Sequence, residues 1–326
     1  MAAPVAIGLS AVVAAMRDGE LVVLTVKAAP RAPAALPSGS FDPAGHRTFE
    51  LALRAFVTEQ TGFELGYVEQ LYTFGDEGRD APLADLGDTA DAPARVISVG
   101  YLALTPKAVD TPETVWSPWT RFFPWEDWRR GRPAALTTLE PGLRAWAARP
   151  GGALATQRLA QLRLLFALDG ARWNEEWVLD RYELIYEAGL APEAARDRTR
   201  SSLTAAHDAQ TALPAAGDPM MSDHRRILAT GLGRLRGKLK YRPVVFELMP
   251  ARFTLSALQR TVEAIAGVSL HKQNFRRVLD RTGFVEGLGV VDPGTGGRPA
   301  ELFRFRRETL TERAASGLSL PLLREG

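Results

Sequence analysis

Cysteine is absent from this chain of 326 residues, and histidine is scarce. Without cysteine, the chain has no disulfide, no thiolate zinc site and no cysteine nucleophile. The four histidines lack the spacing of metal ligands, so we predict no metal site and no cofactor; they are His46, His207, His224 and His271. Only His271 is a candidate phosphate contact. The absence of cysteine fits a cytosolic compartment best.

Long hydrophobic runs are also missing. No apolar stretch reaches the roughly 20 residues that a membrane-spanning helix needs. The apolar segment from Ala2 to Met16 has no basic residues before it and ends at a turn of Arg17, Asp18 and Gly19, so we do not expect an export signal. Hydrophobic residues make up 46% and charged residues 24% of the chain, which is typical of a globular protein, and the length predicts two domains.

Charge is distributed unevenly along the chain. The net charge is +2, but the segment 222–326 holds 16 Arg and 3 Lys against 10 acidic residues, a net charge of +9. The rest of the chain therefore carries −7. Such segregation indicates either a polyanionic partner for the C-terminal part, nucleic acid being the commonest, or a solvated basic surface.

The first hundred residues have the pattern of an α/β domain. Segments Ala6 to Met16 and Leu21 to Lys27 are rich in valine and separated by a short turn, which predicts a hairpin. Thr48 begins a segment with apolar residues at helical spacing, and Gly62 is placed to end that helix. Two further strands are expected, Tyr67 to Phe74 and Arg95 to Leu104.

The middle of the chain changes character after Thr105. Helices are expected at Ala153 to Leu168 and Asn174 to Ala188, and the segment 195–222, poor in large apolar residues, is expected to be a mobile loop or linker. The connector 115–133 is rich in aromatic residues: Trp116, Trp119, Phe122, Phe123, Trp125 and Trp128. These could form a dimer surface, a lid over a ligand or packing for the added helices, and packing is the simplest reading.

The C-terminal part predicts a helix, a turn, a helix and a hairpin. A helix over Asp223 to Leu239 closes the first domain, and a strand-like connector of Val244, Val245 and Phe246 follows. The next elements are two helices, Ser256 to Ala266 and Lys272 to Arg281, and two strands, Val285 to Val291 and Glu301 to Arg306, around a tip at 292–299. This is the pattern of a winged helix.

The second of these helices has one face suited to DNA. Phe275, Val278 and Leu279 form its apolar side. The polar residues on the helix are Lys272, Gln273, Asn274, Arg276, Arg277 and Arg281. Arg and Asn can bond bidentately with base edges, and the others can hold phosphates. Arg298 lies on a glycine-rich tip suited to the DNA backbone, although a solvated hairpin would have the same composition.

A second basic group lies at the end of the preceding helix: Arg234, Arg236, Lys238 and Lys240. These residues either flank DNA or suit the negative end of the helix dipole. The sequence leaves both interpretations open.

Part of the N-terminal domain resembles the frame of a Nudix hydrolase. Leu36 to Gly39 and the helix ending in Glu59 to Phe63 follow that frame. Aligned on Gly62, the motif has Ala55 in place of arginine, Phe56 in place of one glutamate and Gln60 in place of another. Only Glu59 keeps a carboxylate, and one carboxylate cannot hold the metal ions of a pyrophosphate site. We therefore expect no enzymatic activity.

Three segments resemble the Nudix-related transcriptional regulators of NAD metabolism (NrtR-like). They are Tyr67 to Asp76 with Arg79, Asp80 and the strand Val96 to Leu104; Asp223 to Leu248; and the C-terminal stretches Phe253 to Gln259, Asn274 to Arg277 and Gly296 to Phe305. Residues 106–222 exceed what compact members of this family carry. In this respect the chain resembles the larger regulators of NAD biosynthesis in alphaproteobacteria.

This resemblance implies an α/β Nudix-like sandwich with extra helices, followed by a C-terminal winged helix-turn-helix domain. The expected boundaries are 1–240, with a helical insertion at about 106–222, and 241–326. The implied function is a repressor of NAD-metabolism genes. It acts as a homodimer on a palindromic operator of double-stranded DNA and senses ADP-ribose or an adenine nucleotide. The candidate effector contacts are Arg54, Glu59, Tyr72, Phe74 and Asp76.

Two other functions fit the same residues. The chain could be a residual Nudix hydrolase of ADP-ribose-like compounds, although the missing carboxylates and the basic winged helix disfavour this. It could also be a DNA-binding protein whose Nudix fold serves only for dimerisation, because an anion pocket can persist or vanish independently of catalytic acids.

Overall fold

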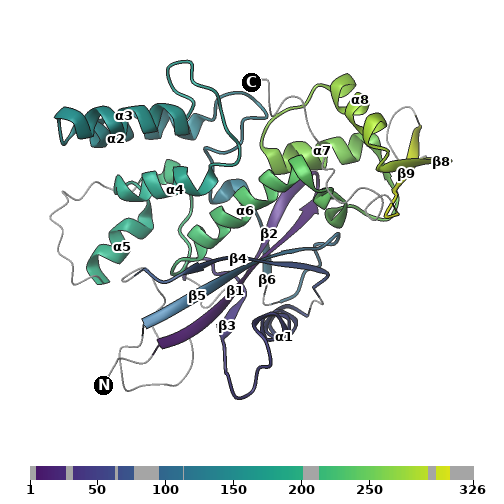
Figure 1. Ribbon diagram of the computed structural model, residues 1–326, viewed down its shortest axis with the longest axis horizontal. Coiled ribbons are helices and arrows are strands. Elements are labelled where there is room, and N and C mark those ends of the chain that lie inside the picture. Colours follow the sequence, from purple (N-terminus) through teal and green to yellow (C-terminus); the bar gives the residue numbers. More distant parts are fainter. Residues whose placement is uncertain are drawn as a thin grey trace.

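The structure is a computed structural model that describes residues 5–26, 32–62, 65–76, 95–112, 114–200, 213–292 and 299–308. It contains a large mixed sheet with helices on both faces and a smaller domain at the C-terminal end (Figure 1). Within the described residues, no helix is both long and apolar enough to span a lipid bilayer.

The large sheet is built around β1. Its strands are β1 (Val5–Arg17), β2 (Glu20–Val26), β3 (Ser38–Ser40), β4 (Tyr67–Phe74), β5 (Arg95–Leu104) and β6 (Thr114–Pro118). They are ordered β4-β5-β1-β2-β6, and β3 pairs with the first part of β1. The β1–β5 pair is parallel, whereas β2 and β3 run antiparallel to β1. The two strands of the predicted hairpin and the strands at 67–74 and 95–104 are thus confirmed.

Sequence alternation explains why β1 occupies the centre. Leu9 and Val13 face one hydrophobic cluster, while Val12 and Ala14 face the cluster on the opposite side of the sheet. Successive side chains of a strand point to opposite faces of the sheet. A strand that is apolar on both faces is stable only when both are covered. The hairpin from β1 to β2 closes at Asp18 and Gly19, both with positive φ, as a tight two-residue turn requires.

The two faces of the sheet carry unequal layers. Helix α1 (Phe49–Thr61) alone covers one face; Thr48 caps its start and Gly62, in the left-handed region, ends it. Helix α6 (His224–Tyr241) crosses the other face and contacts β1, β4 and β5. The starts and ends predicted for both helices are confirmed to within two residues.

The insertion is more helical than the sequence predicted. It contains α2 (Ala134–Ala148), α3 (Gly152–Leu165), α4 (Val178–Glu187) and α5 (Pro192–Arg200), and it begins with the short helix η2 (Trp119–Arg121). Helices α2 and α3 form a hairpin that extends away from the sheet, and α4 lies beside α6 (Figure 1). Helix α2 was not among the predicted helices. It contains Pro141 and Gly142, and its buried face of Leu136, Leu139, Leu143 and Trp146 outweighs their low helix propensity.

The prediction of a mobile loop over 195–222 was wrong at both ends of that segment. Helix α5 extends to Arg200, and the short helix η3 (Pro214–Ala216) and Met220 are packed into the core. Met220 forms a bridge with Ala34, and Arg225 donates to the carbonyl of Ala216. Small residues pack here because tertiary partners cover them. Residues 201–212 lie outside the described part.

The C-terminal domain is a winged helix. It consists of β7 (Phe253–Thr254), α7 (Leu255–Ala266), α8 (Lys272–Thr282), β8 (Val285–Asp292) and β9 (Ala300–Phe305), with sheet order β7-β9-β8. The segment expected to be strand-like is instead the short helix η4 (Val244–Leu248). Phe246 on η4 stacks on Phe305 with ring centroids 4.1 Å apart, so η4 packs as part of the winged-helix core rather than as a sheet edge.

A candidate nucleic-acid interface

Helix α8 has one buried face and one exposed cationic face. Phe275, Val278 and Leu279 are buried, as the spacing predicted. On the other side five side chains are exposed: Lys272, Gln273, Arg276, Arg277 and Arg281. Arg277 donates a 2.9 Å hydrogen bond to the half-buried Asn274, and within the described residues the other four have no hydrogen-bond or ion-pair partner. Their donors are therefore available to an external anion.

The turn before α8 is fixed by side chains of α7. Gln259 donates a 2.9 Å hydrogen bond to the carbonyl of Leu270, and the Leu270 amide donates a 2.8 Å bond to the carboxylate of Glu263. Gln259 also donates to Glu263, so the three groups form a closed set. Because α7 side chains bond both the amide and the carbonyl of Leu270, the angle between α7 and α8 is set by contacts within the domain. The chain thus presents a rigid rather than a loosely attached α8.

The wing itself is only partly described. Strands β8 and β9 pair antiparallel, and Arg304 and Glu286 form an ion pair across them at 2.7 Å. The predicted tip contact Arg298 lies outside the described residues, as do the tip glycines.

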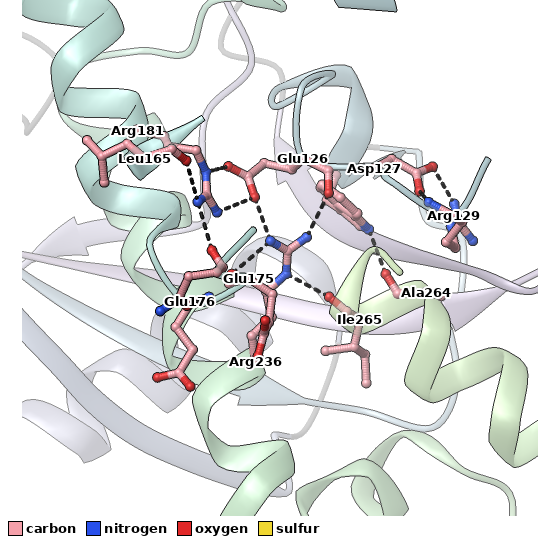
Figure 2. A network of polar contacts seen from close by, with 12 residues as sticks. Glu126, Asp127, Arg129, Leu165, Glu175, Glu176, Arg181, Arg236, Ala264 and Ile265 are labelled. Atoms are coloured by element: carbon pink, nitrogen blue, oxygen red, sulfur yellow. Dashed lines mark hydrogen bonds and ion pairs between the residues drawn. The ribbon is translucent and has the colours of Figure 1, made fainter. Parts of the chain in front are cut away.

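The winged helix is joined to the rest of the molecule by a buried ionic network. Arg236 of α6 donates to the Ile265 carbonyl at the end of α7 at 2.8 Å and to a carboxylate oxygen of Glu126 at 2.5 Å (Figure 2). Arg181 of α4 donates to both oxygens of the same carboxylate, at 2.5 and 2.8 Å. None of the three side chains has exposed surface. One carboxylate therefore ties together the aromatic connector, the insertion and the helix that leads to the winged domain.

This network is ionised despite its burial. Burial raises the pKa of Glu126, but the positive charges of Arg181 and Arg236 outweigh it and hold that pKa below its ordinary value. A charged group in the interior is tolerated only when it is paired and its remaining donors are satisfied. The backbone carbonyls of Leu165, Asn174 and Glu175 accept the other guanidinium hydrogens.

Gly267 allows this docking to be close. It ends α7 in the left-handed region, and a Cβ atom there would lie 2.5 Å from the Glu126 carbonyl oxygen and 2.7 Å from Arg236. The Gly267 carbonyl accepts a 2.6 Å hydrogen bond from the Trp128 amide. The end of α7 and the connector therefore meet backbone to backbone.

The aromatic connector is packing, the simplest of the three readings of the sequence. Trp119, Phe122, Phe123 and Trp125 are buried in one core, and Trp128 is partly buried against it. Trp116 is buried in the cluster on the opposite face of the sheet. The Trp119 indole donates to the Ala264 carbonyl of α7 at 3.2 Å. The cluster thus fills the junction between the sheet, the insertion and the winged helix.

The four basic residues near the end of α6 are engaged in ion pairs within the protein, and Arg236 and Lys238 are buried. Lys238 and Lys240 also lie in the last turn of the helix, where cations suit its dipole. Arg236 belongs to the buried network, and Lys238 forms a 2.6 Å ion pair with Glu69 of β4. Lys240 pairs with Glu175 and Glu176, and Arg234 reaches Glu69 at 3.4 Å. Their ion-pair partners are Glu69 of β4, Glu126 of the connector, and Glu175 and Glu176 before α4. Of the two interpretations that the sequence left open, a position beside DNA is excluded for Arg236 and Lys238 by their burial.

In the Nudix-like frame, aromatic and amide groups occupy the carboxylate positions. Phe56 packs against Gly39, where an added Cβ would lie 2.7 Å from its ring. Gln60 accepts a hydrogen bond from the Ser38 amide at 3.2 Å and donates one to the Ser38 carbonyl at 2.7 Å. Both positions thus fasten β3 to α1. Among the described residues no group of three or more His, Asp or Glu is arranged to hold a metal ion.

The five candidate effector residues are not brought together. Arg54 and Glu59 lie on α1, and Arg54 is engaged with the carbonyls of Leu65 and Gly66 as well as with Glu50. The remaining three lie at the end of β4: Tyr72, Phe74 and Asp76. Phe74 belongs to the cluster on the α6 face of the sheet, and Asp76 pairs with Arg226 of α6. Tyr72, 63% exposed, contacts Phe74 edge to face.

Comparison with known proteins assigns the C-terminal domain. Residues 245–305 match the family described as the NrtR DNA-binding winged helix domain. The ADPR-responsive transcriptional repressor NtrR of Acinetobacter baylyi is 40% identical over 83 residues, which are 26% of this chain and 33% of that protein. The match therefore spans about a third of the length of this relative.

Solved structures with the same domain order support the whole fold. Shewanella oneidensis NrtR complexed with a 27mer DNA has a TM-score of 0.52 at 18% identity, over 94% of this chain and 95% of that chain. A MutT/nudix family protein from Enterococcus faecalis has a TM-score of 0.50 at 16% identity, over 94% and 88%. The predicted fold class is thereby confirmed. The chain combines a Nudix-like α/β domain with a C-terminal winged helix domain that matches the NrtR DNA-binding winged helix domain.

Proposed function

We propose that this chain is a DNA-binding transcriptional repressor that ADP-ribose or a related adenine nucleotide releases from its operator. The observation that carries this proposal is the exposed face of α8, where four donor side chains have no intramolecular partner among the described residues. These donors lie in a domain that matches the NrtR DNA-binding winged helix. In winged and helix-turn-helix proteins this helix enters the major groove.

The side chains of α8 divide into two proposed roles. Arg276, Arg277 and Asn274 project from the first half of the helix and are suited to base edges. Lys272, Gln273 and Arg281 are suited to phosphates, and the sequence predicts the same role for Arg298. The bond between Arg277 and Asn274 holds the guanidinium near the helix before DNA is present. Such ordering lowers the entropy that binding costs.

Effector sensing without hydrolysis is the second part of the proposal. Phe56 and Gln60 replace metal-binding carboxylates and fasten β3 instead, which supports a regulator with no pyrophosphatase activity. The name of the Acinetobacter relative supports ADP-ribose as effector and repression as the outcome. The candidate effector contacts are proposed as two separate groups, Arg54 and Glu59 on α1 and Tyr72, Phe74 and Asp76 at the end of β4. Genes of NAD metabolism remain the proposed targets.

A homodimer on a palindromic operator completes the proposal. A single α8 reads only a few base pairs, and two copies related by a twofold axis would read two half-sites. We also propose a boundary between a sensor part, residues 1–240, and a DNA-binding part, residues 241–326. Residues 244–248 pack with the winged helix, which supports a boundary close to this point.

Selection of bound sequences from random 30-base-pair duplexes tests the proposal. The full chain should enrich a palindrome, and fluorescence anisotropy should show that ADP-ribose weakens binding to it. For substitutions on α8 such as Arg276→Ala, the matched control is Arg304→Ala. It removes a cation of the same domain that is already paired with Glu286. Failure to enrich any sequence would refute the repressor assignment, and enrichment without an effect of ADP-ribose would refute the effector.

A further inference from the structure

A pocket lies in the insertion, on the α6 side of the sheet. Its volume is about 460 Å³, within the range of small-molecule sites. It is formed by the last turn of α3, the connection from α3 to α4 and the end of α6. Its polar and aromatic lining comprises Arg163, Arg172, Trp173, Asn174, Glu175, Trp177 and Lys240. None of these residues belongs to the Nudix-like frame.

The pocket has an excess of positive charge. Arg163 and Arg172 are exposed and, among the described residues, neither has an ion-pair or hydrogen-bond partner from its side chain. The opposite charge in the lining, Glu175, is already matched by Lys240 at 2.7 Å. Two guanidinium groups therefore remain to bind a ligand anion, and guanidinium groups suit phosphate and carboxylate oxygens.

The pocket also has an aromatic surface, and an unpaired donor lies buried in its wall. Trp177 is 37% exposed, which is unusual for an indole that could have been buried. The indole N–H of Trp173 is buried without a hydrogen-bond partner among the described residues. Exposed indole area favours stacking by a planar ring, and an unpaired donor favours a ligand with acceptor atoms.

The wall of this pocket is continuous with the network that holds the winged helix. The Asn174 carbonyl accepts from Arg181 at 2.8 Å, and the Glu175 carbonyl accepts from Arg236 at 3.0 Å. The Trp173 ring stacks on the Arg181 guanidinium, 3.8 Å from the ring centroid. Arg236 in turn bonds to the end of α7. Displacement of residues 173–175 by a ligand would thus act directly on the docking of the DNA-binding domain.

We propose that this pocket is a second ligand site, which binds a small molecule with a planar ring and a phosphate or carboxylate group. Arg163 and Arg172 bind the anionic group, and Trp177 stacks on the ring. The site is separate from the effector site proposed in the Nudix-like domain. Its occupancy bears on DNA binding through Arg181, Glu126 and Arg236.

Isothermal titration calorimetry of the full chain tests this site, with AMP and nicotinamide mononucleotide as probes. Adenosine, which has the ring alone, and inorganic phosphate, which has the anion alone, should bind much more weakly than AMP. The variant Arg163→Gln/Arg172→Gln should weaken binding of the nucleotides about tenfold or more, because it removes two charge-assisted contacts. Trp177→Ala should weaken it to a smaller extent.

A matched control removes two arginines of the hairpin formed by α2 and α3 that do not line the pocket. Arg149→Gln/Arg158→Gln has the same change of charge and should bind the probes as the unmodified chain does. Equal melting temperatures and equal affinity for DNA without nucleotide should show that the pocket variants are folded. If neither probe binds saturably, or if the Arg163→Gln/Arg172→Gln variant binds both like the unmodified chain, the site is refuted whatever the outcome of the operator selection.

Discussion

Arg181, Arg225 and Arg236 have no exposed side-chain surface, whereas Arg276, Arg277 and Arg281 on α8 are exposed. The interior arginines each bond to a carboxylate and to backbone carbonyls, as Arg225 does with Glu193 and the Phe122 carbonyl. Those on α8 have few or no protein partners. The same residue type thus serves architecture in one region and is left free for an external anion in the other.

This difference corrects the reading of charge along the chain. The excess of +9 in residues 222–326 includes Arg225, Arg236 and Lys238, which are buried among acidic or carbonyl partners. Only part of the excess is available to an external anion. Net charge of a segment therefore indicates the kind of partner but overstates how many cations face it.

Removal of the shared carboxylate should have the largest effect. Glu126→Gln leaves Arg181 and Arg236 buried without a counter-charge, and we expect a loss of about 3 to 5 kcal/mol in the free energy of unfolding, measured in urea. The control Glu286→Gln removes the partner of exposed Arg304 and should cost less than about 1 kcal/mol. Equal losses for the two variants would show that the interior network does not support the fold.

Loss of a base contact on α8 should affect DNA binding and leave stability unchanged. We expect at least one of Arg276→Ala and Arg277→Ala to cost about 1 to 3 kcal/mol on the selected operator and little on random DNA. Arg281→Ala should weaken both duplexes alike and flatten the dependence on salt by about one unit. Anisotropy titrations at several salt concentrations measure this. Unchanged operator binding in all three variants would place the DNA contacts elsewhere.

Histidines show the same contrast between interior and surface, with a smaller effect. Burial, with a further contribution from the charge of Arg196, lowers the pKa of His224 to about 4, and its Nδ1 accepts from the Leu36 amide. Between that pKa and the ordinary one, His224 is therefore protonated in the unfolded chain and neutral in the folded chain. Stability should fall as pH falls from about 6.5 to about 4, by about 1 to 3 kcal/mol.

The variant His224→Asn isolates this effect, because its side-chain oxygen can accept the same amide without titrating. It should flatten the dependence of unfolding free energy on pH between about 6.5 and 4. His271→Asn, at an exposed histidine, is the control for the loss of an imidazole elsewhere in the chain. A pH profile that His224→Asn does not change would assign the acid sensitivity to other groups.

The smallest expected effect is none at all. Glu59 keeps the carboxylate of the Nudix-like frame, but its neighbours Phe56 and Gln60 serve packing and hydrogen bonding to β3. We expect no hydrolysis of ADP-ribose with Mg²⁺ or Mn²⁺, and therefore no change in product formation with Glu59→Gln, as followed by chromatography. Turnover that disappears in Glu59→Gln would reverse this proposal.

Local sequence determined most of the elements of secondary structure. Thr48 and Gly62 bound α1, Asp18 and Gly19 close the hairpin, and the apolar spacing of Phe275, Val278 and Leu279 defines the inner face of α8. Each of these features depends on residues close together along the chain, so pattern alone is sufficient. The resemblance to the larger alphaproteobacterial regulators depends on residues 106–222 and stays a prediction.

Only the tertiary structure decided how these elements meet. Helix α2 forms in spite of Pro141 because its apolar face is buried. The segment at 244–248, whose apolar composition suggested a strand, forms η4 instead because Phe246 stacks on Phe305. Glu126 lies 55 residues from Arg181 and 110 residues from Arg236, and no local pattern marks these three as partners. Buried ion pairs depend on geometry assembled from distant segments. The sequence by itself therefore determined a winged helix with a cationic face, and tertiary contacts decided which cations remain free to act.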